Sequence, residues 1–279
     1  MLTQMLNHPA LEGPVVSITL HNTQEPATAE LDTQAATLAC MSRVVVHSLR
    51  DMNTLAAPGL THNTTLIPQG ATPPLPGPIP RPLTPQDPVV LGSYGFFLPG
   101  KGPPELIEAL ALLHQHWPRA LLRLIKAEYP AAQSAAEIAT CRAPVTARGL
   151  DRAVLFETAF LDFADSTNRL QKCDLLVLPY QGSREGSSAA LRSALVTGVP
   201  VVVTPLALFE EAGPAVLTLP GTTPAAIAAG LGAALRDHAA RTAVAVAGRT
   251  WLQERAWDRI GTRFGAILTA LRISGLTVD

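Results

Sequence analysis

The chain has 279 residues, of which 47% are hydrophobic, and a formal net charge of −1 at pH 7. This length suffices for one large or two small domains, and a mean hydropathy of +0.22 suits a well-buried α/β protein. The balanced charge gives no sign of nucleic-acid binding. No apolar run approaches the roughly 18 residues of a membrane span, and residues 1–13 lack the apolar core of a signal peptide. We therefore expect a cytoplasmic protein, and loose association with a membrane surface is left open.

The three cysteines, Cys40, Cys141 and Cys173, are widely spaced. Their odd number and the absence of a metal-binding spacing predict reduced thiols, which are typical of the cytoplasm.

The first part of the chain predicts a small parallel sheet. Strand-like segments at residues 15–20 and 43–47 flank a helix expected over residues 28–41, and residues 65–67 form a third short strand. The β-α-β order implies that the first two strands pair in parallel. Three strands alone would expose a large apolar face. This part therefore packs on the rest of the chain, is covered by a partner chain, or belongs to a longer protein.

A proline-rich segment follows at residues 68–88. Proline at this density blocks helix and sheet and favours an extended, semi-rigid connector. A recognition ligand for a proline-binding domain is the alternative, but a linker explains the segment without a partner. We expect the linker to divide the chain into two parts, residues 1–87 and residues 88–279.

Residues beyond the linker alternate regularly between strand and helix patterns. This alternation predicts a parallel, doubly wound α/β sheet, whose ligands bind at the carboxyl ends of the strands. The expected strands are residues 89–94, 120–125, 154–157, 175–178, 200–204 and 215–218. The expected helices are residues 103–116, 131–142, 166–171, a helix starting near 187, 224–236, and helical stretches between 239 and 271.

Two loops at these carboxyl ends carry residues suited to a ligand. In the first loop, Lys101 stands between Gly100 and Gly102. A closely approaching backbone with one cation suits a diphosphate, although a solvated lysine in a turn would give the same pattern.

The second loop leads into the helix expected from Ser187 and contains Glu185 and Gly186. A helix N-terminus attracts phosphate, and Ser187 and Ser188 are suitable N-caps. Glu185 could accept hydrogen bonds from sugar hydroxyls, or it could only stabilise the helix by about 0.3–1 kcal/mol. Together the two loops predict a nucleotide-sugar site.

The second loop and its surroundings resemble a known family. Pro179, Glu185-Gly186 and the Gly-Val-Pro-Val-Val run at residues 198–202 are similar to the donor-binding half of GT-B glycosyltransferases of family 4. The earlier Thr-Leu-His-Asn, Val-Val-His-Ser and Ile-Pro-Gln-Gly runs resemble the closing part of the first Rossmann-like domain in these enzymes. The resemblance implies a GT-B-like fold in which residues 1–87 are a truncated, partial acceptor-side domain and residues 88–279 are the donor-binding domain.

The resemblance also implies an activity: retaining transfer of a hexosyl group from a nucleotide-diphosphate sugar to a glycan or small acceptor. It places Glu185, Lys101 and His21 in catalytic roles, with Lys101 stabilising the departing diphosphate. The donor-binding residues that it implies are Gly100, Gly102, Gly186, Ser187, Ser188, Arg192 and Ser193. No metal and no cofactor besides the donor sugar are expected, because paired carboxylates for Mg²⁺ or Mn²⁺ are missing from these loops.

The chain departs from the family pattern at three places. Ser193 stands where the family has a second glutamate that binds the ribose. Phe96 stands where an arginine usually precedes the loop lysine, so Arg192 or Arg184 would have to replace one phosphate cation. A Lys-Ala-Glu run at residues 126–128 replaces a glycine-containing turn.

These departures keep a rival hypothesis open, in which the chain is a non-catalytic nucleotide-sugar-binding protein or depends on a partner chain. A nicotinamide-dependent oxidoreductase would need a Gly-x-Gly-x-x-Gly turn after a strand. No such turn occurs here.

Overall fold

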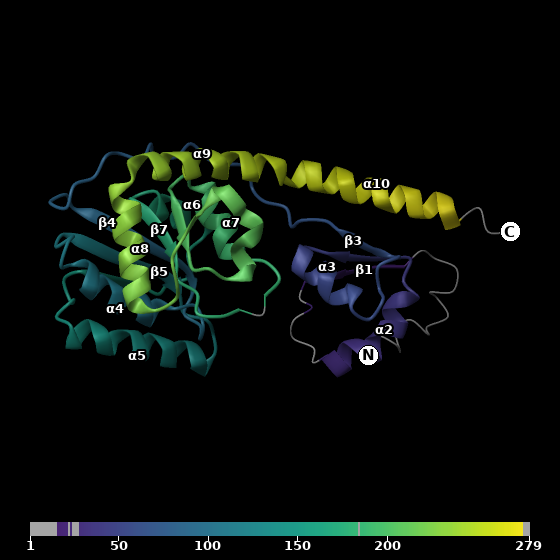
Figure 1. The fold of residues 1–279 in the computed structure, drawn as a ribbon, viewed down its shortest axis with the longest axis horizontal. Helices are drawn as coiled ribbons and strands as arrows, with labels where there is room; N and C mark the ends of the chain where they lie inside the picture. Colours follow the sequence, from purple (N-terminus) through teal and green to yellow (C-terminus); the bar gives the residue numbers. More distant parts are fainter. Residues whose placement is uncertain (1–15, 22, 24–27, 184, 276–279) are drawn as a thin grey trace. The chain divides into compact units, whose positions relative to one another are not determined.

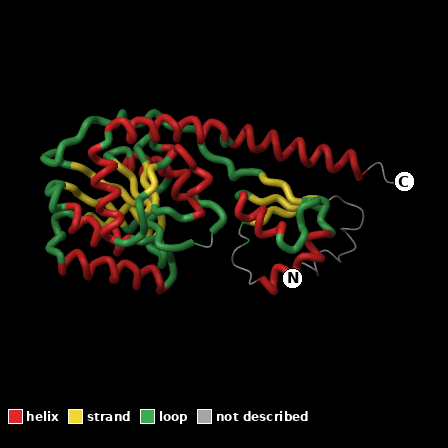
Figure 2. Tube along the Cα trace, viewed as in Figure 1, coloured by secondary structure: helices red, strands yellow, loops and turns green. Residues whose placement is uncertain are grey.

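The computed structural model describes residues 16–21, 23, 28–183 and 185–275. It contains two compact units (Figures 1 and 2). Unit 1 comprises Met1–Ala71, Arg184–Ser187 and Arg255–Asp279, and unit 2 comprises Thr72–Ser183 and Ser188–Glu254. Within the described residues, no helix combines the length and apolarity needed to cross a membrane.

Unit 1 contains a parallel sheet in the order β1-β2-β3, which confirms the predicted β-α-β arrangement. Helix α3 was not predicted, because it has only eight residues. It is defined by its cap, since the Ser48 hydroxyl accepts a hydrogen bond from the Asp51 N–H at 3.1 Å. The elements are β1 (Ser17–Leu20), α2 (Thr28–Ala39), β2 (Arg43–Val46), α3 (Leu49–Ala56), β3 (Thr64–Leu66) and α10 (Trp257–Gly275).

Both faces of this small sheet are covered inside unit 1. On one face, Val44 and Val46 of β2 pack with Leu38 and Leu55 from the neighbouring helices. On the other face, Val45 packs with Ile67 and with Ile260 of α10, which Phe264 and Ile267 extend. A helix from the far end of the sequence thus covers the apolar face that the strand pattern alone would leave open.

Unit 2 contains a six-stranded parallel sheet in the order β6-β5-β4-β7-β8-β9, and this confirms the predicted doubly wound α/β fold. Its strands are β4 (Val89–Phe96), β5 (Ala120–Ala127), β6 (Val154–Glu157), β7 (Leu175–Leu178), β8 (Val201–Val203) and β9 (Leu217–Thr218). Its helices are α4 (Pro103–Leu113), α5 (Ala132–Ala147), α6 (Phe163–Leu170), α7 (Ala189–Val196), η2 (Ala207–Ala215), α8 (Pro224–Arg236) and α9 (His238–Glu254).

The main core of unit 2 lies between the sheet and α4, α5 and α8. It is built around the fully buried Trp117 and includes Leu91, Leu122 and Leu175 from the strands. In Figure 1, α4 and α5 lie on the opposite side of this sheet from α7 and α9. Because helices cover both faces of the sheet, the loops gather at the carboxyl ends of the strands.

Several predicted helix boundaries differ from the structure: α4 ends at Leu113 and not at residue 116, and α6 begins at Phe163 and not at residue 166. Helix α5 continues to Ala147, five residues beyond the expected end, because Cys141 and Val145 are buried in the core on either side of Pro144. Helix α7 begins at Ala189 and not at Ser187. The short η2 segment was not predicted at all.

The proline-rich segment is extended and is held by hydrogen bonds within unit 2. Its carbonyl groups accept hydrogen bonds from long side chains: Gln171 donates to Pro76 at 2.7 Å, and His238 lies 2.8 Å from the oxygen of Pro80. Arg241 donates to the Arg81 carbonyl at 2.7 Å. Since proline lacks an N–H donor, these carbonyls are the groups by which such a segment can be fixed.

Candidate functional site

The β4–α4 loop of unit 2 owes its shape to glycines. Gly95, Gly100 and Gly102 all have positive φ, at 127°, 80° and 72°, a region that other residues rarely adopt. A Cβ atom on Gly102 would overlap the Pro179 carbonyl oxygen, and one on Gly100 would lie 3.1 Å from the Gly182 oxygen. The loop therefore packs directly on the segment that follows β7.

Lys101 is held at this junction. The Gly100 carbonyl accepts a hydrogen bond from the Gln181 N–H at 2.8 Å. The Lys101 ammonium lies 4.3 Å from the centre of the buried Tyr180 ring, a distance suited to a cation–π contact. The predicted loop lysine thus stands over the carboxyl end of β7.

Helix α7 begins beside this junction, and Ser188 is its N-cap. The Ser188 hydroxyl accepts a hydrogen bond from the Leu191 N–H at 3.2 Å, and Ser188 is only 1% exposed. The first turn contains no acidic residue, so the partial positive charge of the helix end is not balanced by its own sequence. Ser187 is not a cap, contrary to the expectation that both serines cap the helix.

Arg192 is buried on α7 and bound within the unit. Its guanidinium donates to the Ser188 carbonyl at 3.0 Å and to the Glu211 carboxylate at 3.0 Å. Burial lowers the arginine pKa, while Glu211 acts in the opposite direction. Through these contacts Arg192 stabilises the first turn of α7. Ser193, the next residue, is half-buried on the same helix.

Three aromatic side chains gather at the carboxyl ends of β4, β5 and β6. Phe96 meets Tyr129 edge-on with ring centres 5.3 Å apart, and stacks with Phe160 at 6.2 Å. Phe160 is 78% exposed. The side chain that replaces the expected arginine is therefore part of an open aromatic surface.

The remaining predicted residues belong to unit 1. His21 ends β1 and is exposed, and its Nδ1 lies 3.2 Å from Nε2 of the buried His47. The other His47 nitrogen, Nδ1, lies 2.9 Å from the Ile67 carbonyl oxygen. Because a carbonyl only accepts, His47 carries a proton on Nδ1.

The Glu185–Ser187 segment lies in the same unit as His21. Ser187 donates a hydrogen bond to the Gln69 side-chain oxygen at 2.8 Å. Gly186 is required, because a side chain there would collide with the buried Asp51 carboxylate. Glu185 is exposed. The structure thus groups Gly100, Lys101, Gly102, Ser188, Arg192 and Ser193 in unit 2, and His21, Glu185, Gly186 and Ser187 in unit 1. Arg184 lies outside the described residues.

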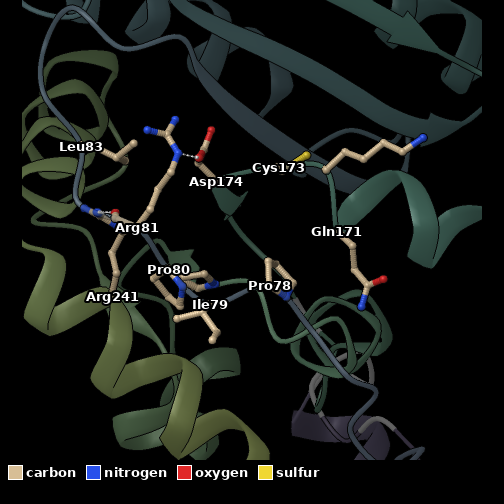
Figure 3. Close-up of a pocket in the computed structure, with 11 residues that line it drawn as sticks. Pro78, Ile79, Pro80, Arg81, Leu83, Gln171, Cys173, Asp174 and Arg241 are labelled. Carbon is tan, nitrogen blue, oxygen red and sulfur yellow. Dashed lines mark hydrogen bonds and ion pairs between the residues drawn. The ribbon is translucent and has the colours of Figure 1, made fainter.

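A separate cavity of about 210 Å³ lies at the amino ends of the strands of unit 2, beside the proline-rich segment (Figure 3). Arg81 faces Asp174 across it at 3.4 Å, and Arg241 reaches the backbone of Arg81. Its charged groups are thus used to hold the proline-rich segment. Among the described residues, no group of three or more His, Cys, Asp or Glu side chains could hold a metal ion.

The family model described as "Glycosyl transferases group 1" matches residues 88–237, more than half of the chain. The chain belongs to this family. The match coincides with unit 2 and includes both ligand loops, so the resemblance stated for the second loop is confirmed. No curated protein matches this glycosyltransferase chain.

Solved structures similar to this glycosyltransferase share its GT-B fold. Sucrose-phosphate synthase from Thermosynechococcus elongatus has a TM-score of 0.73 at 20% identity, over 92% of this chain and 68% of that chain. HepE from Anabaena, in complex with UDP and glucose, has a TM-score of 0.76 at 17% identity, over 96% and 75%. A trehalose-phosphate synthase from Burkholderia xenovorans has a TM-score of 0.75 at 13% identity, over 93% and 70%.

Sequence analysis noted Lys126 only as part of the run that replaces a glycine-containing turn, and assigned no catalytic or phosphate-binding role to it. It lies near the end of β5, and its side chain is completely buried. The available signal was a lysine in a strand that is apolar apart from Arg123, which is unusual because lysine is rarely buried without a partner.

Proposed function

We propose that this glycosyltransferase transfers a hexosyl group from a nucleotide-diphosphate sugar to a glycan or small acceptor hydroxyl, with retention of the anomeric configuration. The proposal rests chiefly on one observation: the glycine-bounded Lys101 loop packs onto the segment after β7, and β4, which leads into this loop, meets the first turn of α7 at Gly95. A cation and a helix N-terminus next to one another are the donors that a diphosphate requires.

The main catalytic contribution would be stabilisation of the leaving group. As the bond from the anomeric carbon to the diphosphate breaks, the electron pair stays on the phosphate oxygen. Lys101 and the backbone N–H groups at the start of α7 would stabilise that charge, with Gly100 and Gly102 allowing close approach. Ser188 would hold the helix end in place, supported by Arg192.

Glu185, Gly186 and Ser187 are proposed to serve the transferred sugar, with the exposed Glu185 carboxylate accepting hydrogen bonds from its hydroxyls. His21 is proposed to act on the acceptor side. Its ring is exposed at the end of β1, where it could accept the proton that the attacking hydroxyl loses. No metal ion is part of this proposal, and Ser193 is proposed to face the nucleotide ribose.

Calorimetric titration with UDP, GDP, ADP and their sugar conjugates tests the donor site. UDP comes first, because the HepE structures contain UDP or UDP-glucose. We expect one nucleotide to bind, and its affinity to fall about ten- to hundredfold in Lys101→Ala, as expected for a charge-assisted contact. The exposed Lys172→Ala is the matched control and should bind normally. A folded wild-type chain that binds none of these compounds would refute the proposal.

A non-catalytic nucleotide-sugar-binding role is the second candidate, favoured by Phe96 and Ser193 in place of the family residues. Mass spectrometry of donor turnover separates the two. Release of nucleotide in wild type, lost in Glu185→Ala while the nucleotide still binds, supports the enzyme. Binding without any donor turnover across a range of acceptors supports the second candidate. Peripheral association with a membrane and binding of a partner chain are two further proposals.

A further inference from the structure

Lys126 is fully buried on a face of the sheet that is apolar around it except for the buried Ser93 of β4. Side chains alternate along β5, so Lys126 shares the core side of the strand with Leu122 and Leu124. Leu122, Leu124 and Lys126 are all 0% exposed. A lysine at such a position is costly unless its charge has a partner.

The protein itself gives this ammonium little compensation. Within the described part of the chain its one hydrogen bond runs to the Tyr94 carbonyl oxygen at 3.4 Å, whereas an ammonium has three donors. Among the residues that the structure describes, no carboxylate lies within ion-pair distance of Lys126. Burial, together with the nearby charge of Lys101, lowers the pKa of Lys126 to about 7.

No side chain from β4 occupies the space beside the ammonium, because its neighbour there is a glycine. The strand register pairs Gly95 with Lys126. A Cβ atom on Gly95 would lie 4.0 Å from the Lys126 nitrogen and 3.7 Å from the Ala190 side chain, in the first turn of α7. Gly95 is partly exposed, so the surface of the molecule lies next to this space. A buried cation and a helix N-terminus flank it, and both favour a negative charge there.

The residue next to Gly95 is the one at which this chain lacks the expected arginine. Phe96 contributes to the aromatic surface instead. The whole chain contains only three lysines, Lys101, Lys126 and Lys172, and the first two are close enough to influence one another.

We propose that Lys126 is the second cation of the diphosphate site, supplied by β5 in place of the arginine that β4 lacks. This inference rests on the proposed function, because it requires that unit 2 binds a nucleoside diphosphate. The diphosphate would enter beside Gly95 and accept hydrogen bonds from the Lys126 ammonium, the α7 N–H groups and Lys101.

Binding then has a proton signature. At pH 8 the free Lys126 amine is mostly neutral, because its pKa is about 7. A bound diphosphate favours the charged form, so the protein takes up a proton as UDP binds. The other titratable groups that face Lys126 are Lys101, Glu137 and Cys141, with Glu105 next to Glu137. Burial raises the pKa of Cys141 to about 12, so this thiol stays neutral at pH 8.

Nuclear magnetic resonance of lysines labelled at Cε tests the proposal on the wild-type protein. Three lysines give three signals, and Lys101→Met and Lys172→Met assign two of them. We expect saturating UDP to raise the pKa of Lys126 by about one to three pH units. Inorganic pyrophosphate, which has no base, should act in the same direction. A Lys126 signal whose pKa is unchanged by saturating UDP would overturn the inference.

Calorimetry on Lys126→Met supplies the second test. At pH 7 its affinity for UDP should fall about ten- to hundredfold. Its proton uptake at pH 8, measured in two buffers of different ionisation enthalpy, should disappear. Lys172→Met is the matched control, and it should keep both the wild-type affinity for UDP and the wild-type proton uptake. If wild type binds UDP and Lys126→Met binds it equally well, this inference alone fails. If wild type binds neither UDP nor GDP nor ADP, the proposed function fails as well.

Discussion

Replacing Gly102 by alanine should damage the donor site more than the fold. Gly102 has φ = 72°, where a side chain costs about 1–2 kcal/mol for conformation alone. The new Cβ would also overlap the Pro179 carbonyl oxygen, and the loop would have to retreat by roughly 1 Å. That movement takes Lys101 away from its position 4.3 Å over the Tyr180 ring. A misplacement of this size costs on the order of a hundredfold in transfer rate.

Gly149→Ala is the matched control for this experiment. Gly149 has φ = 65°, and a Cβ there meets no atom within 4 Å. Both variants should therefore pay the conformational cost, which corresponds to a melting temperature lower by about 2–8 °C. Only Gly102→Ala should lose nucleotide binding in calorimetry and donor turnover in mass spectrometry. Wild-type nucleotide affinity in Gly102→Ala would refute the claim that this loop contact positions the phosphate cation.

Three further predictions concern groups that the fold buries. At pH 8 a thiol reagent should rapidly modify only the exposed Cys40 of the native protein, because burial raises the pKa values of Cys141 and Cys173 to about 12. Rapid reaction of all three cysteines would contradict the burial of Cys141 and Cys173. Without nucleotide, Lys126→Met should be more stable than wild type at pH 7. Between about pH 7 and 10.4 the unfolded wild-type chain binds a proton on Lys126 that the folded chain does not, and this lowers the free energy of unfolding of wild type at pH 7. In urea unfolding, the difference in free energy of unfolding between Lys126→Met and wild type should narrow as pH rises towards 10. Equal stabilities at pH 7 would count against the lowered pKa of Lys126. Arg241→Met should lower the free energy of unfolding by about 2–5 kcal/mol, because the buried guanidinium donates to three backbone carbonyls. If urea unfolding shows a decrease of less than about 1 kcal/mol, water replaces these hydrogen bonds.

The alternating pattern of strands and helices was sufficient to predict the doubly wound sheet. Elements whose pattern is local and strongly apolar, such as β7 and β8, were found where expected. The misses have a common cause, which is that tertiary contacts decide them. Helix α3 depends on the Ser48 cap, and the far end of α5 on burial of Val145 around a proline. The cover of the small sheet by Ile260 joins segments about 200 residues apart, which no local pattern encodes.

The candidate site was predicted unevenly for a related reason. Lys101 and Ser188 could be found because glycines mark a tight loop and a serine marks a helix start. The sequence did not reveal that Arg192 is committed to Glu211, because nothing local indicates that the two meet. Nor did it reveal that Ser187 hydrogen-bonds to Gln69, 118 positions away.

The two departures at Phe96 and Lys126 show what the sheet adds to the sequence. Along the chain they are thirty positions apart and look like unrelated losses, one of an arginine and one of a glycine. The register places Gly95 beside Lys126 and Phe96 beside Ala127, so the two departures lie on adjoining strands at one end of the sheet. Under the proposal, β5 supplies the cation that β4 lacks once a bound diphosphate favours the protonated form of Lys126. Since a bulky side chain at residue 95 would fill the space between the Lys126 ammonium and α7, the exchange depends on a small residue there. Gly95→Val should therefore weaken nucleotide binding even though both lysines remain.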